Sequence, residues 1–231
     1  MARVVKAREE RTDELLDTAQ VLFAERGYHD TSVQAITDAA GVAKGLFYHY
    51  FDSKEDLLDA LAKREVERIF EAVYAKSREI EGVPLDELAL LLGMLANWEL
   101  NEAQALTGAL LHVMYGDGNA SLRHRLYERW GDLLKPLVTE LIDEGNALGQ
   151  TDVEDPEATA EVLVSMLSGM GDRLMGVLMI GGSDSVDLVV RSLEAAERAA
   201  ERTLGAAAGT LHVYDHATIR PSLLALIEKG A

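Results

Sequence analysis

Apolar positions recur every three or four residues through most of the chain, which is the spacing of one face of an α-helix. The first such stripe consists of Leu15, Leu16, Ala19, Leu22 and Phe23. Gly27 follows it as a helix stop. Strict alternation of apolar and polar residues, which is typical of half-buried strands, extends over no useful length. The pattern therefore predicts an all-α protein.

Short helices are predicted at the start of the chain. Thr31 opens the second of them, with Gln34 in capping-box spacing, and Gly41 interrupts the pattern. A compact helix is then predicted over residues 43–50. Ser53 caps a long helix that runs to about residue 81.

A bundle of long helices is predicted after the hinge-like Gly82-Val83-Pro84. Their expected ranges are 85–100, 102–115, 121–148, 156–180 and 185–204. Residues 205–231 form an extension with a short helix over 221–229. The expected architecture is thus a small N-terminal head, a connecting helix and a C-terminal bundle.

Composition narrows the functional classes. The 231 residues are 48% hydrophobic and 27% charged and include no cysteine, which excludes disulfides, thiolate zinc sites and cysteine nucleophiles. The net charge of −18 provides no general attraction to nucleic acid, so any DNA binding must come from a local patch. Residues 1–64 carry nine Lys/Arg and twelve Asp/Glu, so the acidity belongs mainly to the bundle.

Neither secretion nor membrane insertion is expected. The first residues lack an apolar signal segment, and the most apolar stretch, residues 162–183, has Asp172 and Arg173 at its centre. A cytoplasmic location is therefore expected. Motifs of hydrolases, zinc proteases and nucleotide-binding loops are also missing, so neither an enzyme nor a cofactor is expected.

Residues 31–54 have the pattern of a helix-turn-helix. Gly41 suits the sharp turn, and Val42, Phe47 and Phe51 can anchor the second helix inward. The residues left on its outer face are Ala43, Lys44, Gly45, Tyr48 and His49. Small residues allow close approach to a DNA groove, Lys44 can meet phosphate, and the aromatic polar groups can bond phosphates or base edges.

The same region resembles the tetracycline-repressor-like (TetR) family of bacterial regulators. The resemblance covers roughly residues 10–60 and rests on Ala24-Glu-Arg-Gly-Tyr28, Thr31-Ser32, Ala40-Gly41-Val42, Lys44-Gly45, Phe47-Tyr48-His49-Tyr50-Phe51 and Ser53-Lys54-Glu55. It implies a DNA-binding head over residues 1–52 and a ligand-binding and dimerisation domain over residues 53–231. Within the latter, residues 53–81 would connect the two and residues 156–204 would form the dimer helices.

The resemblance also implies which residues lie near DNA. They are Val33, Gln34, Ala43, Lys44, Gly45, Leu46, Tyr48, His49 and Tyr50. Lys54 would meet a phosphate. Thr37 departs from the small alanine common at its position, and its hydroxyl is expected to bond back to the helix. A basic segment precedes the head, with Arg3, Lys6, Arg8 and Arg11, and is either a flexible DNA-binding arm or a solvated tail.

Methionines and aromatic residues gather in the bundle, which contains six of the seven methionines. They suit a cavity for a hydrophobic or aromatic small molecule, although an ordinary core is the alternative for each. The candidate ligand-binding residues are Met94, Trp98, His112, Tyr115, Trp130, Met166, Met170 and Arg173. Asp172 and Arg173 could instead pair across a dimer.

Two neighbouring helices carry small or apolar residues suited to a homodimer interface. The candidates are Ser165, Gly169, Gly176, Val186, Val189, Val190, Leu193 and Ala200. The same residues could pack within one chain, and only the family resemblance favours a dimer. In the extension, His212 and His216 have metal-like spacing on one helix face, with Asp215 nearby, but no convincing third ligand follows, so no metal is expected.

Together with these patterns, the resemblance implies a repressor that an effector releases from a pseudo-palindromic operator. A regulator that needs a co-repressor and a helical DNA-binding regulator without an effector are the alternatives.

Overall fold

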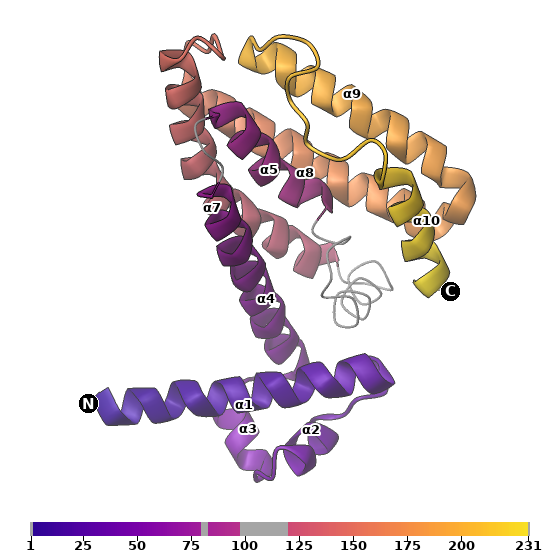
Figure 1. Ribbon diagram of the computed structural model, residues 1–231. Coiled ribbons are helices and arrows are strands. Elements are labelled where there is room, and N and C mark those ends of the chain that lie inside the picture. The colour runs from indigo at the N-terminus through magenta and orange to yellow at the C-terminus, as the bar shows by residue number, and fades with distance from the viewer. Residues whose placement is uncertain (1, 80–82, 98–119, 231) are drawn as a thin grey trace. The chain divides into compact units, whose positions relative to one another are not determined.

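The computed structural model describes residues 2–79, 83–97 and 120–230, and within these ranges it contains helices and irregular segments but no strand (Figure 1). The all-α prediction is therefore confirmed. Contacts divide the described residues into two compact units, residues 2–65 with 120–122 and residues 66–79, 83–97 and 123–230. No helix in the described ranges is long and apolar enough for a membrane span.

The first unit contains α1 (Ala2–Arg26), α2 (Val33–Ala39), α3 (Lys44–Tyr50) and the first part of α4 (Lys54–Ser77). Its fully buried side chains include Leu15, Ala19, Ile36, Phe47, Leu57 and Leu61. The domain boundary expected at residue 52 lies just before α4. The contact boundary lies after Glu65 instead, because the leucines of the first turns of α4 are buried in this unit.

Polar contacts also join α4 to α1 in the first unit. The guanidinium of Arg64 donates a hydrogen bond to Gln20 Oε1 (2.9 Å) and lies 2.8 Å from Asp17 Oδ1. The residues predicted to form a separate basic arm are the first turns of α1, which begins at Ala2. The contact of this basic segment with DNA stays a prediction.

The helix ends in this unit follow local chemistry. Ser32, rather than the predicted Thr31, caps α2, since its Oγ accepts a hydrogen bond from the Ala35 N–H (3.1 Å). Thr31 is buried and its hydroxyl donates to the Gly27 carbonyl (2.8 Å). The predicted cap of α4 is confirmed, because Ser53 Oγ accepts from the Asp56 N–H (3.0 Å).

The second unit contains the rest of α4 together with α5 (Pro84–Asn97), most of α7 (Ala120–Ala147), α8 (Pro156–Gly181), the short 3-10 helix η2 (Gly182–Ser185), α9 (Val186–Leu204) and α10 (Ile219–Gly230). Helix α8 packs against both α5 and α9. The core of the second unit is mainly aliphatic and includes Leu88, Leu91, Leu92, Leu134, Val138, Ile142 and Leu163.

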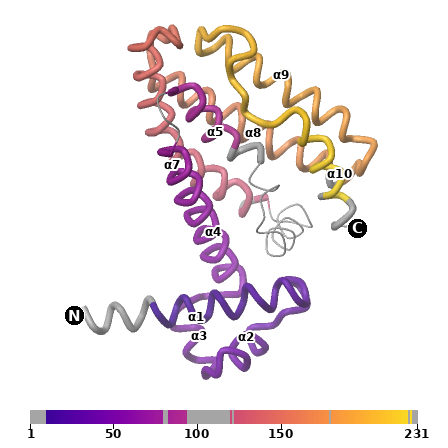
Figure 2. Tube along the Cα trace, viewed as in Figure 1, coloured from indigo at the N-terminus to yellow at the C-terminus, as the bar shows by residue number. Residues whose placement is uncertain are grey.

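The chain reverses after Gly205 and runs back along α9 as an irregular segment before α10 (Figure 2). Gly205 has a positive φ of 63°, which ends α9 at no steric cost. Leu211, Val213 and Tyr214 of this segment are buried. The predicted C-terminal helix is confirmed from Ile219 onward, but His212 and His216 precede it and do not share a helix face.

This return segment changes the interpretation of α9. Four predicted dimer residues, Val186, Val189, Leu193 and Ala200, are buried within the chain itself. In the single chain they are covered, since α8 and α10 pack against α9 and the return segment is hydrogen-bonded to it. Of the other candidates, Ser165 and Gly169 are exposed, while Gly176 and Val190 are half-buried.

Candidate nucleic-acid interface

Helix α3 has one buried and one exposed face. Phe47 is fully buried and Phe51 is 4% exposed, with their ring centroids 5.6 Å apart. Val42, expected to be a third anchor, is half-buried. Tyr48 on the other face is 51% exposed, and its ring meets that of Phe47 edge-on at 5.4 Å. The helix is therefore held by one aromatic face and presents the other to solvent.

Most of the predicted DNA-contacting residues are accessible in the isolated chain. The exposed ones are Gln34, Ala43, Lys44, Gly45, Tyr48 and His49, and the half-buried ones are Val33, Leu46, Tyr50 and Lys54. The structure thus brings all ten together in the first unit. Their contact with DNA stays a prediction.

The turn between α2 and α3 sets where the exposed face lies. Gly41 has a φ of 67°, and the Val42 N–H donates to the Thr37 carbonyl (2.9 Å) while the Gly41 N–H donates to the Asp38 carbonyl (3.2 Å). This is the bonding pattern of a Schellman motif, which needs a left-handed residue at the position of Gly41. The turn predicted from the sequence therefore forms as expected.

Side chains of α2 are held by local bonds. The Gln34 amide donates to Asp38 Oδ1 (2.7 Å), so it lies along the exposed helix surface. The buried Thr37 hydroxyl donates to the Gln34 carbonyl (3.0 Å). The back-bonding expected for Thr37 is confirmed.

Lys54 has partners within the chain. Its Nζ donates to the carbonyls of Tyr28 (2.8 Å) and Thr31 (2.9 Å), and it lies 4.1 Å from the centre of the Tyr28 ring. Burial lowers the pKa of the ammonium below its usual value. Lys54 therefore joins α4 to the segment that precedes α2. A phosphate contact would have to use the remaining N–H donor.

Glu55 completes this connection. Its Oε1 accepts a hydrogen bond from the Tyr28 hydroxyl (3.2 Å). Burial and then the Glu55 charge raise the pKa of the Tyr28 phenol, while the backbone N–H of Glu55 is the main cause that lowers the pKa of its own carboxyl. The sequence motif contained all three residues, but only the fold showed that they bond to one another.

The surface of α2 and α3 carries little charge. Residues 31–50 contain one lysine, Lys44, and one acid, Asp38, with no arginine. Sequence recognition on this surface would therefore depend on Tyr48, His49 and Gln34 as hydrogen-bonding groups.

The candidate ligand-binding residues are described only in part. Trp130 is 2% exposed, Met166 and Met170 are half-buried, and Arg173 is exposed. Trp98, His112 and Tyr115 lie outside the described residues, as does the side chain of Met94. Asp172 pairs with Arg123 of the same chain (Nε to Oδ1, 3.0 Å), which gives it a partner without a dimer.

Ser168 in the bundle was not among the residues predicted from the sequence to be functional. Ser168 of α8 is 8% exposed, and its Oγ has no hydrogen-bond partner among the described residues. A buried hydroxyl without a partner costs free energy, so such a group is suited to a bound molecule. The signal available in the sequence was a serine inside an otherwise apolar helical stretch.

Comparison with known proteins identifies relatives of the first unit. Residues 15–61 match the family model for bacterial regulatory proteins of the tetR family. The HTH-type transcriptional repressor KstR2 of Rhodococcus jostii is 46% identical over 81 residues, which cover 35% of this chain and 38% of that protein. The chain thus matches well under two thirds of this relative's length.

Two further comparisons extend into the second unit. The fatty acid metabolism regulator protein of Bacillus subtilis is 28% identical over 143 residues, covering 61% of this chain and 72% of that protein. A TetR-family transcriptional regulator from Pectobacterium atrosepticum has a similar structure, with a TM-score of 0.60 and 24% identity over 86% of this chain and 96% of that one. The relatives named here are regulators rather than enzymes.

Proposed function

We propose that this chain is a TetR-like, ligand-responsive transcriptional repressor that binds operator DNA through α3, and the match of residues 15–61 to the tetR family model supports this proposal. The observation that carries the proposal is the orientation of α3. Phe47 of α3 and Phe51 directly after it are buried, while Lys44, Tyr48 and His49 are exposed to solvent. Insertion of such a helix into the major groove would place these groups near phosphates and base edges. Operator binding also implies a cytoplasmic location.

Operator binding would require two copies of α3. In helix-turn-helix dimers the two recognition helices lie about 34–36 Å apart, one turn of DNA, and read a pseudo-palindrome. We assign the dimer contact to the exposed side of α8, which includes Val162, Ser165 and Gly169.

The direct test of DNA recognition removes two exposed groups of α3. A binding site is first selected from random double-stranded DNA with the wild-type protein. The Lys44→Ala/Tyr48→Ala double variant is expected to lose specific binding to that site in fluorescence anisotropy, because a phosphate contact and a base or phosphate contact both disappear.

A matched control uses another exposed lysine and tyrosine. Tyr74 and Lys76 lie on α4 outside the candidate interface, and Tyr74 is 37% exposed. The Tyr74→Ala/Lys76→Ala variant is expected to bind the selected site as the wild type does. Unchanged specific binding by the α3 variant, with both variants folded by circular dichroism, would contradict the assignment.

An apolar or aromatic effector is the second part of the proposal. The methionines and Trp130 of the second unit support it, and the Ser168 hydroxyl would provide one hydrogen-bonding group. Fatty-acyl compounds are the first class to test, since one relative is named a fatty acid metabolism regulator. Thermal stabilisation provides the screen, because a ligand at 100 times its Kd adds about 2.7 kcal/mol.

A further inference from the structure

The return segment after α9 brings two histidines to a glutamate of that helix. One ligand atom from each of Glu197, His212 and His216 lies within 4.8 Å of the other two. Both histidines are exposed, whereas the Glu197 side chain is 8% exposed. All three belong to the second compact unit. Nothing in the proposed DNA or effector binding uses these residues.

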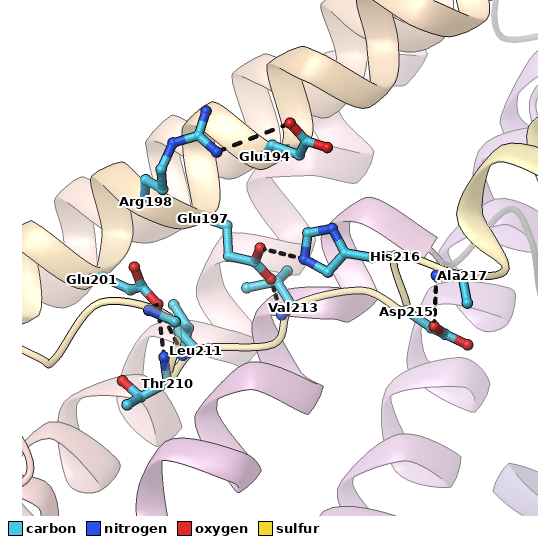
Figure 3. Close-up of polar contacts among 11 residues, drawn as sticks. Glu194, Glu197, Arg198, Glu201, Thr210, Leu211, Val213, Asp215, His216 and Ala217 are labelled. Atoms are coloured by element: carbon cyan, nitrogen blue, oxygen red, sulfur yellow. Dashed lines mark hydrogen bonds and ion pairs between the residues drawn. The ribbon is translucent and has the colours of Figure 1, made fainter.

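Glu197 is held in a defined orientation. Its Oε1 accepts a hydrogen bond from the Val213 N–H (2.8 Å), and its Oε2 lies 2.9 Å from His216 Nε2 (Figure 3). The Tyr214 ring packs against the His216 imidazole with 4.7 Å between centroids. In metal sites, groups that contact a ligand residue without contacting the metal fix the orientation of that ligand.

The carboxylate expected from the sequence is not part of this cluster. Asp215 instead accepts a hydrogen bond from the Ala217 N–H (2.9 Å; Figure 3). It accepts a second one from the Thr218 hydroxyl (2.8 Å). The missing third ligand comes from α9, fifteen residues before His212 in the sequence. Only the reversal of the chain after Gly205 brings it close.

We propose that Glu197, His212 and His216 bind a divalent transition-metal ion of the Zn²⁺ class, with water as the fourth ligand. Two imidazoles and one carboxylate are a donor set that Zn²⁺ accepts readily, and an open fourth position is common for such sets. Oxygen-preferring ions such as Mg²⁺ are poorly served by imidazole.

The ligand atoms must shift to bind an ion, because they now lie within 4.8 Å of one another. Ligand atoms about 2.0–2.1 Å from a tetrahedral ion lie about 3.3 Å apart. The 2.9 Å separation of the His216 and Glu197 atoms must therefore widen by a few tenths of an ångström. His212 is exposed on an irregular segment, which leaves its side chain room to close on the ion. A bound ion would cross-link the return segment to α9.

Metal binding is tested on full-length protein freed of any affinity tag and stripped with EDTA. Equilibrium dialysis against Zn²⁺ with elemental analysis is expected to give one ion per chain for the wild type. His212→Ala removes one exposed ligand and is expected to weaken Zn²⁺ binding at least about 100-fold. Co²⁺ substitution provides a second measurement, since tetrahedral Co²⁺ has intense visible absorption bands.

The matched control is His124→Ala. His124 is an exposed histidine 3.3 Å from Glu128 on α7, so it offers an imidazole and a carboxylate without the third ligand. This variant is expected to bind Zn²⁺ like the wild type. Glu197→Gln keeps an oxygen acceptor for the Val213 N–H, and it is expected to lose the ion while staying folded.

Thermal unfolding provides an independent measurement. Zn²⁺ is expected to raise the Tm of the wild type and of His124→Ala, but not that of His212→Ala. Equal Zn²⁺ binding by wild type and His212→Ala would overturn the proposal. The same conclusion would follow if the wild type bound no Zn²⁺.

Discussion

Single residues of the first unit take up structural roles that determine how its surface is presented. Lys54 shows this best, because its ammonium bonds two carbonyls that lie 26 and 23 residues earlier in the chain. The resemblance to TetR-like regulators implied a phosphate contact for the same side chain. The two carbonyl partners indicate that Lys54 stabilises the segment between α1 and α2.

Replacing Lys54 tests this role. Lys54→Ala leaves the Tyr28 and Thr31 carbonyls without their donor, so the free energy of unfolding is expected to fall by about 1–3 kcal/mol. Urea denaturation of the wild type and of the variant measures this loss of unfolding free energy. Lys63→Ala, an exposed lysine on the same helix, is the control and should change little. If Lys54 only contacted a DNA phosphate, Lys54→Ala would leave the free energy of unfolding unchanged. It would instead reduce the slope of log K for DNA binding against log salt by about one.

At the scale of the element, the helix-turn-helix depends on one left-handed residue. The Schellman turn at Gly41 ends α2 and lets α3 begin within a few residues. An added Cβ would meet nothing within 4 Å at Gly41. Any cost of a substitution there must therefore come from the backbone conformation and not from crowding.

Two alanine substitutions separate these effects. Gly41→Ala is expected to lower the free energy of unfolding by about 1–2 kcal/mol, since an L-residue is strained at a φ of 67°. Gly45→Ala in α3 also meets nothing within 4 Å, but its φ is not left-handed, so it is expected to raise stability by about 0.5 kcal/mol. Opposite signs in thermal or urea unfolding support this account, whereas equal losses would contradict it.

At the scale of the whole molecule, the surface left for a second copy differs from the one first expected. The apolar face of α9 is covered by its own chain, while Val162, Ser165 and Gly169 on α8 remain exposed. An added Cβ at Gly169 meets nothing within 4 Å, so the single chain can accept a side chain there.

Gly169→Arg therefore tests the dimer without disturbing the monomer core. A bulky charge in a close helix contact is expected to shift the protein towards monomer in size-exclusion chromatography with light scattering, and to weaken operator binding with it. Glu140→Arg, at an exposed position of α7, is the control. A Gly169→Arg protein that stays dimeric would exclude this part of α8 from the interface.

The proposed function also requires communication between effector and operator, which is a property of the whole molecule. Helix α4 contributes residues to both compact units, so a ligand that favours one position of α4 can alter DNA affinity. We expect the effector and the operator to weaken each other's binding by the same factor, within about 5–150-fold. Titrating a stabilising compound with and without the selected DNA measures both factors. Equal affinities in the two titrations would exclude a switch.

Much of the first unit was determined by the sequence alone. The helical period, the Ser53 cap and the Gly41 turn all depend on residues that are close in the chain. Local spacing is enough to specify them, because helix bonds and caps join residues three to five apart. The exposed face of α3 follows directly from these features.

Other features were decided only by tertiary structure. The sequence could not show that the chain reverses after Gly205, because an apolar stripe on α9 fits a second copy as well as its own chain. The same reversal brings Glu197 to two histidines. Lys54 likewise meets carbonyls far back in the sequence. Such contacts join residues distant in the chain, and only the packing of whole elements determines which of the possible partners come together.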